Sequence, residues 1–306
     1  MNGRPPSLHP TTKPPSPPPI LKTPLLPTPN ELLLLSIYPI TLLLGHLYSL
    51  LSPTTRHLPY DPVAQSHPAA HAPSYFARKN NLLNLLFVKL GWLWTTVVLA
   101  LFVATHPRFG VGGLAGQVVL RWAGSTGVWY LVTQWCFGPG LVDRSFALTG
   151  GRCQVLKDPV AMEEMGKAGE VFTRVACKAA GGQWRGGHDI SGHVFMLVLG
   201  SAMVAAEVAP AVVSWVRLVR DRNGVTTTMG SDGQETDDSA VSGLGVKAAA
   251  VYLALSWWML LMTALYFHTW FEKLTGLIIG LAGFWLIYYL PRGMAPVRAI
   301  VGMPGL

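Results

Sequence analysis

Six long apolar stretches constrain the fold of this chain more than any other feature of its sequence. They cover residues 31–52, 81–105, 112–138, 194–216, 247–267 and 274–291. A helix needs about 20 mostly apolar residues to cross a bilayer, and a backbone within lipid must pair its polar groups internally. We therefore predict an all-α, polytopic membrane protein with about six transmembrane helices, of which the last is short.

The composition supports a membrane protein and argues against nucleic-acid binding. Of the 306 residues, 50% are hydrophobic and only 12% are charged, which is too apolar for an ordinary soluble domain of this length. The net charge is +8, but the basic residues are spread along the chain and no nucleic-acid-binding motif is present. Chemistry with anionic lipids or phosphates suits this charge better.

We expect one transmembrane domain at 31–291 with a short tail at either end. Residues 1–30 are rich in proline, which removes backbone donors and fixes φ, so they are predicted to form a disordered tail. This tail does not resemble a cleaved signal peptide. Residues 292–306 form the C-terminal tail. An even number of spans places both termini on one side of the membrane, and the distribution of Lys and Arg tilts that side toward the cytosol.

The long polar connection at 139–190 is expected to carry structure of its own. Apolar residues between Met165 and Ala179 recur at steps of three or four, as in an amphipathic helix that lies on a membrane. Cys153 and Cys177 can form a disulfide if this connection is lumenal, and the sequence leaves their pairing open. No set of side chains has metal-ligand spacing, so neither a metal nor another cofactor is expected.

Two histidines are expected to meet at one face of the membrane. His193 begins the fourth apolar stretch and His268 ends the fifth, so antiparallel neighbouring helices would bring both imidazoles to the same end. Glu272 follows His268 by four residues, a spacing that places the carboxylate and the imidazole on one helical face. Such a set can transfer phosphoryl groups, because one histidine can attack phosphorus while the other protonates the leaving oxygen. The alternative is that both histidines only mark the ends of spans.

The segment GGHDISGHVFMLVLGS, residues 186–201, is predicted to supply an anion-binding helix start. Gly192 permits close approach of the backbone, and Ser191 together with free N–H groups can bind phosphate oxygens. His188 is a further candidate for contact with phosphate. The alternative for His188 is a loop histidine that is capped by Asp189 and does not touch the substrate.

Four basic residues are candidates for a cation that holds the phosphates: Lys89, Arg121, Arg185 and Lys273. Lys273 is the nearest to a histidine in the sequence. Lys89 and Arg121 lie inside predicted spans, where a cation is a functional candidate by default. However, Lys89 can also extend to the membrane surface. Arg121 and Glu207 can pair with partners in the bundle or only lie in polar seams between helices.

Three segments resemble the fat storage-inducing transmembrane proteins of the endoplasmic reticulum. GHDISGHVFML resembles the hallmark segment of that family, and ALYFHTWFEKLTGLIIG resembles its second histidine segment. SYFARKNNLLNLLFVKLGWLWT, from Ser74 to Thr95, is similar to its early signature. The resemblance runs from about residue 31 to 291 and leaves out only the proline-rich tail and the loop at 217–246.

The resemblance implies six spans, cytosolic termini, a lumenal site and a helical core like that of the lipid phosphate phosphatases. The implied activity is cleavage of the diphosphate of fatty acyl-CoA to acyl 4'-phosphopantetheine and adenosine 3',5'-bisphosphate. By position, His193 matches the general acid of those phosphatases and His268 matches their nucleophile. The sequence departs from them in two ways: Glu272 stands where they usually carry Asp, and their first motif with Lys and Arg is not recognisable.

Two other functions stay open at this point. One is a non-enzymatic protein that binds diacylglycerol or triacylglycerol and partitions neutral lipid into droplets. The other is a transferase that passes the phosphoryl group to an alcohol. For the implied enzyme, the partners are fatty acyl-CoA and membrane lipids, and the implied role is in lipid-droplet formation, phospholipid synthesis and homeostasis of the endoplasmic reticulum membrane. The sequence indicates no protein partner.

Overall fold

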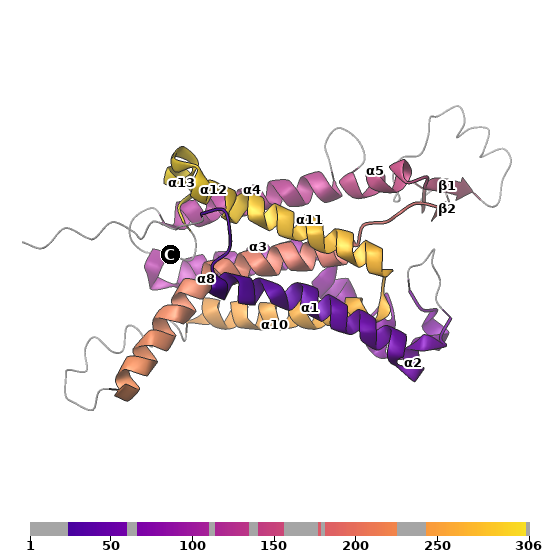
Figure 1. The fold of residues 1–306 in the computed structure, drawn as a ribbon, viewed down its shortest axis with the longest axis horizontal. Helices are drawn as coiled ribbons and strands as arrows, with labels where there is room; N and C mark the ends of the chain where they lie inside the picture. The colour runs from indigo at the N-terminus through magenta and orange to yellow at the C-terminus, as the bar shows by residue number, and fades with distance from the viewer. Residues whose placement is uncertain are drawn as a thin grey trace, which may run out of the picture.

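The chain folds into an elongated bundle of long helices (Figure 1). This computed structural model describes residues 24–59, 66–109, 114–134, 140–155, 177–178, 181–224 and 243–303. The long described helices run side by side along the bundle: α1 (Pro29–Leu51), α3 (Gly91–Thr105), α4 (Leu114–Thr133), α8 (Gly192–Gly224), α10 (Leu244–Tyr266) and α11 (Trp270–Tyr288).

Short elements connect these helices or extend their ends. The short helical elements are α2 (Pro53–Arg56), the 3-10 turns η1 (Ala69–His71), η2 (Tyr75–Ala77) and η4 (Pro107–Phe109), the π-helical turn η3 (Asn84–Val88), α5 (Leu141–Leu148), α12 (Leu290–Gly293) and α13 (Ala295–Val301). Strands β1 (Arg152–Val155) and β2 (Gly182–Arg185) pair in an antiparallel sheet. Both strands lie in the long connection between α4 and α8.

Four of the described helices are long and apolar enough to cross a membrane. They are α1, the first 22 residues of α8, α10, and α11 together with α12. Helix α3 is also apolar but has only 15 residues. The prediction of an all-α, polytopic membrane fold is confirmed. The segment predicted to be an amphipathic helix lies almost entirely outside the described residues.

The second predicted span, residues 81–105, is not one continuous helix. Residues Asn84–Val88 form a π-helical turn, and α3 begins only at Gly91. Two asparagine side chains bind the backbone here: Asn81 Oδ1 accepts from the Asn84 N–H at 2.8 Å, and Asn84 Nδ2 donates to the Lys79 carbonyl at 2.6 Å. Asparagine side chains that bind nearby backbone groups compete with a regular α-helix, which explains the interruption.

Helix α8 lies at the centre of the bundle, where it contacts α3, α4, α10 and α11. Two glycines let α11 approach it closely. A Cβ atom on Gly276 would lie only 2.6 Å from the Ser191 carbonyl oxygen, and one on Gly280 would lie 3.1 Å from that of Phe195. Small residues at a helix–helix contact permit such close approach within a membrane. The first turns of α8 and α11 are therefore held side by side.

Both ends of the described chain lie at the same end of the bundle. The Trp285 indole donates to the Leu25 carbonyl at 2.9 Å, and Arg292 donates to the two oxygens of Glu31 at 2.5 and 3.1 Å. Helix α2 and the two strands lie at the opposite end (Figure 1). An even number of membrane crossings would give this arrangement.

A buried ion pair joins α4 to α8. Arg121 Nε and Nη2 donate to the two oxygens of Glu207 at 2.6 and 2.7 Å, and the Tyr288 hydroxyl donates to the same carboxylate at 2.9 Å. Arg121 also donates to the Val301 carbonyl at the end of α13. Of the two alternatives for Arg121 and Glu207, the structure shows pairing within the bundle, and each residue is the partner of the other. Arg121 is the wrong candidate for a phosphate-binding cation, because Glu207 and Val301 already occupy its guanidinium.

Candidate active site

Helix α11 begins earlier than the apolar pattern predicts. Thr269 and Glu272 form a capping box: Thr269 Oγ1 accepts from the Glu272 N–H, and Glu272 Oε2 accepts from the Thr269 N–H at 2.8 Å. A capping box satisfies N–H groups that a helix start would leave without partners. The helix therefore begins at Trp270 rather than near residue 274, and Glu272 belongs to its first turn.

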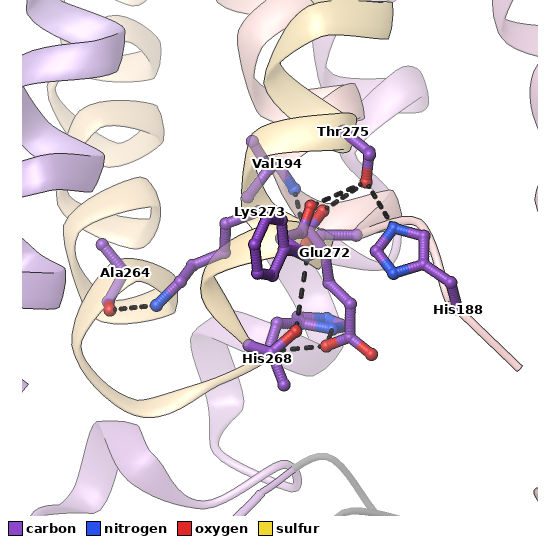
Figure 2. Close-up of polar contacts among 10 residues, drawn as sticks. His188, Val194, Ala264, His268, Glu272, Lys273 and Thr275 are labelled. Atoms are coloured by element: carbon purple, nitrogen blue, oxygen red, sulfur yellow. Dashed lines mark hydrogen bonds and ion pairs between the residues drawn. The ribbon is translucent and has the colours of Figure 1, made fainter. Parts of the chain in front are cut away.

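The expectation that His268 and Glu272 share one helical face is wrong. His268 lies in the connection between α10 and α11, with a φ of +59°, a left-handed conformation that is uncommon for residues other than glycine. The two side chains meet for another reason: the capping box turns the Glu272 carboxylate back toward the helix start. His268 Nδ1 lies 3.4 Å from Glu272 Oε2, and each side chain is only 10% exposed (Figure 2).

The first turn of α8 brings His193 beside His268. The centroids of the two imidazoles are 6.1 Å apart, and their planes are inclined at 55°. Helix α8 begins next to the point where α10 ends, as the antiparallel arrangement in the sequence analysis requires. The structure thus places both predicted histidines at one end of the bundle, within reach of a single small group.

Asn84 is a residue of this site that the sequence analysis did not single out. Its Oδ1 lies 2.8 Å from His193 Nε2, and the residue is only 4% exposed. Asparagines at positions 80, 81 and 84 stand at the edge of an apolar stretch. A polar side chain there must find a partner when it is buried. That pattern was the signal for Asn84, but it does not reveal which partner the amide has.

The start of α8 is tied to α11 through Ser191. Ser191 is fully buried, its N–H donates to the Glu272 carbonyl at 3.1 Å, and its Oγ accepts from the Val194 N–H at 3.4 Å. A Cβ atom on Gly192 would meet only open space. Ser191 therefore caps α8 and fixes it beside Glu272, while Gly192 leaves room next to His193. Contact of either residue with phosphate stays a prediction.

His188 is held against the first turns of α11. Its N–H donates to Thr149 Oγ1 at 2.6 Å, and its Nε2 lies 3.2 Å from Thr275 Oγ1 (Figure 2). The Thr275 hydroxyl donates to the Phe271 and Glu272 carbonyls at 3.0 Å, so its oxygen is an acceptor for His188 Nε2. His188 thus holds the segment before α8 against α11. Its contact with substrate stays a prediction.

The structure does not assign the predicted phosphate cation. Lys273 is only 2% exposed, and its Nζ donates to the Ala264 carbonyl at 2.7 Å, on the opposite side of α11 from His188 (Figure 2). Lys89 is exposed on the turn before α3. The side chain of Arg185 lies outside the part of the chain that the structure describes. Lys273 is directed toward the end of α10, which offers it a buried carbonyl.

A disulfide joins Cys153 in β1 to Cys177, with the Cα atoms 5.6 Å apart. This answers the question that the sequence left open. Cys153 pairs in the sheet with Trp184 of β2, and β2 leads through Gly186 to His188. The disulfide and the sheet therefore anchor the segment that enters the histidine site.

The family of the chain follows from the segments that build this site. Residues 72–288 match the family described as FIT, fat storage-inducing transmembrane protein. This range covers well over half of the chain and contains both histidine segments and Asn84. The chain belongs to the FIT family. The transmembrane character of this family agrees with the four described helices that are long and apolar enough to cross a membrane.

Several curated relatives of this FIT protein are named as acyl-coenzyme A diphosphatases. Acyl-coenzyme A diphosphatase fit1 of Schizosaccharomyces pombe is 33% identical over 276 residues, which cover 89% of this chain and 90% of that protein. Acyl-coenzyme A diphosphatase FITM2 of Sus scrofa is 30% identical over 233 residues, 73% of this chain and 77% of that protein. The protein of that name from Homo sapiens is 29% identical over 228 residues, 73% of this chain and 76% of that protein. No solved structure gives a significant match.

The site of this FIT protein holds two imidazoles in different surroundings. His268 faces the carboxylate of Glu272, whereas His193 faces the amide of Asn84. A carboxylate raises the basicity of a ring that it orients, and a neutral amide orients a ring without adding charge. Among the described residues, no group of three or more His, Cys, Asp and Glu side chains is placed to hold a metal ion. A ring that faces a carboxylate next to a ring that faces a neutral amide suits covalent phosphoryl transfer.

Proposed function

We propose that this FIT protein is an acyl-CoA diphosphatase. It hydrolyses the diphosphate of fatty acyl-CoA to acyl 4'-phosphopantetheine and adenosine 3',5'-bisphosphate. The observation that carries the proposal is the pair of facing imidazoles, His193 and His268, whose centroids are 6.1 Å apart. The names of the relatives support the choice of substrate, since fit1 and the FITM2 proteins are acyl-coenzyme A diphosphatases.

His268 is the nucleophile of the proposed reaction. Its Nδ1 faces Glu272 at 3.4 Å, so Nε2 is the ring nitrogen that attacks phosphorus. The carboxylate stabilises the positive charge that develops on the ring as the N–P bond forms. A separation of 3.4 Å is longer than a well-formed hydrogen bond, and we expect it to shorten when substrate binds, as catalytic hydrogen bonds often do.

His193 is the general acid of the first step and the general base of the second. As the N–P bond forms, the bond from that phosphorus to the bridging oxygen breaks, and His193 gives this oxygen a proton. One phosphate monoester leaves. A water molecule then attacks the phosphohistidine, neutral His193 accepts a proton from the water, and the N–P bond breaks. One diphosphate and one water have become two monoesters, and both histidines return to their initial states.

We place this site on the lumenal side of the endoplasmic reticulum membrane, with both termini in the cytosol. The disulfide between Cys153 and Cys177 belongs to the histidine end of the bundle, and disulfides persist in oxidising compartments. A glycosylation acceptor inserted after Leu148, which is 87% exposed, tests this orientation. We expect it to be glycosylated in cells. A folded but unglycosylated insertion variant would place the histidines in the cytosol.

In this orientation the enzyme would remove acyl-CoA from the lumenal leaflet. Such removal would support lipid-droplet formation, phospholipid synthesis and the homeostasis of that membrane. Diacylglycerol and triacylglycerol are the neutral lipids that the exposed apolar faces of α1 and α10 would meet in the bilayer. Their binding is part of the proposal only as contact with surrounding lipid.

The test is release of adenosine 3',5'-bisphosphate from oleoyl-CoA by the purified protein in detergent. We expect the wild type to release it together with an equal amount of oleoyl 4'-phosphopantetheine, and His193→Ala to lose this activity. His106→Ala is the matched control, because His106 packs against Phe102 and Phe109 at the far end of α3. A folded wild type that binds triacylglycerol without product release would support the non-enzymatic function. Products that form only with an added alcohol would indicate a transferase.

A further inference from the structure

We infer that Asn84 is a positioning residue of the reaction: it fixes His193 with a proton on Nε2, so that Nδ1 is the nitrogen that serves the leaving oxygen. The inference rests on the proposed function and adds to it one residue and one ring atom. It starts from a contact between two segments that lie 109 residues apart in the sequence.

The orientation of the Asn84 amide is set by the backbone. Its Nδ2 donates to the Lys79 carbonyl at 2.6 Å, and a carbonyl oxygen can only accept. The other end of the amide, Oδ1, therefore faces His193 Nε2 at 2.8 Å. Since Oδ1 also only accepts, His193 Nε2 must carry the hydrogen. The Lys79 carbonyl thus determines the protonation pattern of His193 through one asparagine side chain.

This protonation pattern gives the two nitrogens of His193 different tasks: Nε2 binds Asn84, and Nδ1 transfers the proton. The Nε2–H bond to Asn84 persists whether the ring is neutral or protonated. When the ring is protonated, Nδ1 carries the second proton and gives it to the bridging oxygen as the P–O bond breaks. The resulting neutral ring keeps its bond to Asn84, and Nδ1 is ready to accept a proton from water in the second step.

A neutral partner suits an acid better than a charged one. Among the described residues, His268 is a titratable group beside His193, and Glu272 contacts His268 in turn. An amide at position 84 orients His193 without adding negative charge next to the ring. A carboxylate at position 84 would hold that proton more tightly.

A purely structural role explains only part of the Asn84 contacts. Asn81 fixes the turn by donating to the Arg78 carbonyl at 2.6 Å and by accepting from the Asn84 N–H at 2.8 Å. The Asn84 N–H and Nδ2 complete this turn. Oδ1 contributes nothing to the turn, because it points to an imidazole on α8. The rigid turn therefore supports an oxygen whose partner is a predicted catalytic histidine.

Steady-state kinetics of three variants test the inference. For Asn84→Ala we expect kcat to fall about 10- to 100-fold with little change in KM, because the ring loses its orientation. For Asn84→Asp we expect the loss of activity at high pH to move upward by about one pH unit. Asn80→Ala is the matched control, since Asn80 is an exposed neighbour and should leave kcat, KM and the pH profile unchanged.

A second measurement does not depend on turnover. Diethyl pyrocarbonate modifies unprotonated imidazole, and mass spectrometry of the peptide that contains His193 gives the pH midpoint of its reactivity. We expect this midpoint to rise by about one pH unit in Asn84→Asp relative to the wild type. A residue that only shapes the turn would change the unfolding temperature without moving the midpoint.

The outcomes separate this inference from the proposed function. An active wild type whose folded Asn84→Ala and Asn84→Asp variants keep its kcat, pH profile and His193 midpoint would overturn the inference alone. A wild type without bisphosphate release would overturn the proposed function. In that case the pH midpoint of His193 reactivity still decides whether Asn84 controls the protonation of the His193 ring.

Discussion

The two histidines of the site are held in opposite ways. His193 stands in the first turn of a regular helix, α8, and its partner Asn84 comes from a π-helical turn 109 residues away in the sequence. His268 stands outside any helix with a φ of +59°, and its partner Glu272 follows four residues later. One imidazole is held by tertiary structure and a neutral amide, and the other by a local turn and a carboxylate.

This difference supports the two chemical roles that we propose for the histidines. A nucleophile needs electron density at its attacking nitrogen, which a carboxylate on the far nitrogen supplies. An acid needs a proton that it can release, which an amide partner permits. The strained backbone at His268 supports the same assignment, because left-handed conformations of residues with side chains persist where the surrounding structure enforces them, often at functional sites.

The largest expected effect comes from removal of the His268 imidazole, which faces the Glu272 carboxylate. His268→Ala should lower kcat about 10⁴-fold or more, because no N–P bond can form. A substrate with ³²P in its diphosphate should label the wild type with an acid-labile, alkali-stable adduct, and His268→Ala should remain unlabelled. His193→Ala should still become labelled, although slowly. Label on the peptide that contains His193, found in His268→Ala, would reverse the two roles.

A smaller loss is expected when the carboxylate beside His268 is neutralised. Glu272→Gln should lower kcat roughly 10²- to 10⁴-fold. Glutamine can still complete a capping box with Thr269, so the unfolding temperature should change little. The measurement is kcat together with the thermal unfolding midpoint in detergent. Unchanged turnover in a folded Glu272→Gln protein would remove the carboxylate from the reaction.

A second capping box, at the start of α1, supplies the control for Glu272→Gln. Glu31 caps α1 with Thr28, as Glu272 caps α11 with Thr269, but it faces Arg292 instead of a histidine. Glu31→Gln should therefore show the reverse pattern: a lower unfolding temperature, because an ion pair is lost, and an unchanged kcat. Equal kinetic losses in both variants would mean that helix capping, and not the charge beside His268, controls the activity.

The sequence predicted the features that depend on local pattern. Apolar runs predicted the membrane helices, and the spacing of His193 and His268 within two antiparallel runs predicted that they would meet. The proximity of His268 and Glu272 was also predicted, but for the wrong reason. The apolar run of α11 starts near residue 274, whereas the structure starts the helix at Trp270 because of the capping box. The Thr-x-x-Glu pattern at Thr269 was present in the sequence and would have placed this start correctly.

The remaining site features depend on contacts between distant segments, which no local pattern encodes. Asn84 reaches His193 only because η3 packs beside the start of α8. Lys273 was a reasonable phosphate cation by sequence, but the end of α10 presents the Ala264 carbonyl to it at 2.7 Å. The pairing of Cys153 with Cys177 depends on how β1 and β2 fold back on each other, and spacing alone could not decide it.

The smallest expected effect concerns His188, which binds Thr275 of α11 next to the two central histidines. Thr275→Val removes the acceptor of His188 Nε2, which lies 3.2 Å away, while valine keeps the shape of the side chain. If His188 contacts substrate, its looser ring should raise KM by less than about 10-fold and leave kcat nearly unchanged, since one neutral hydrogen bond contributes roughly 0.5–1.5 kcal/mol.

His188→Ala should raise KM to a similar extent, and the double variant should add little, because both changes break one contact. Wild-type KM in both single variants would instead make His188 a loop residue that only closes the segment against α11. Either result separates His188 from the two central histidines: their substitution changes kcat, whereas His188 affects substrate binding or the loop alone.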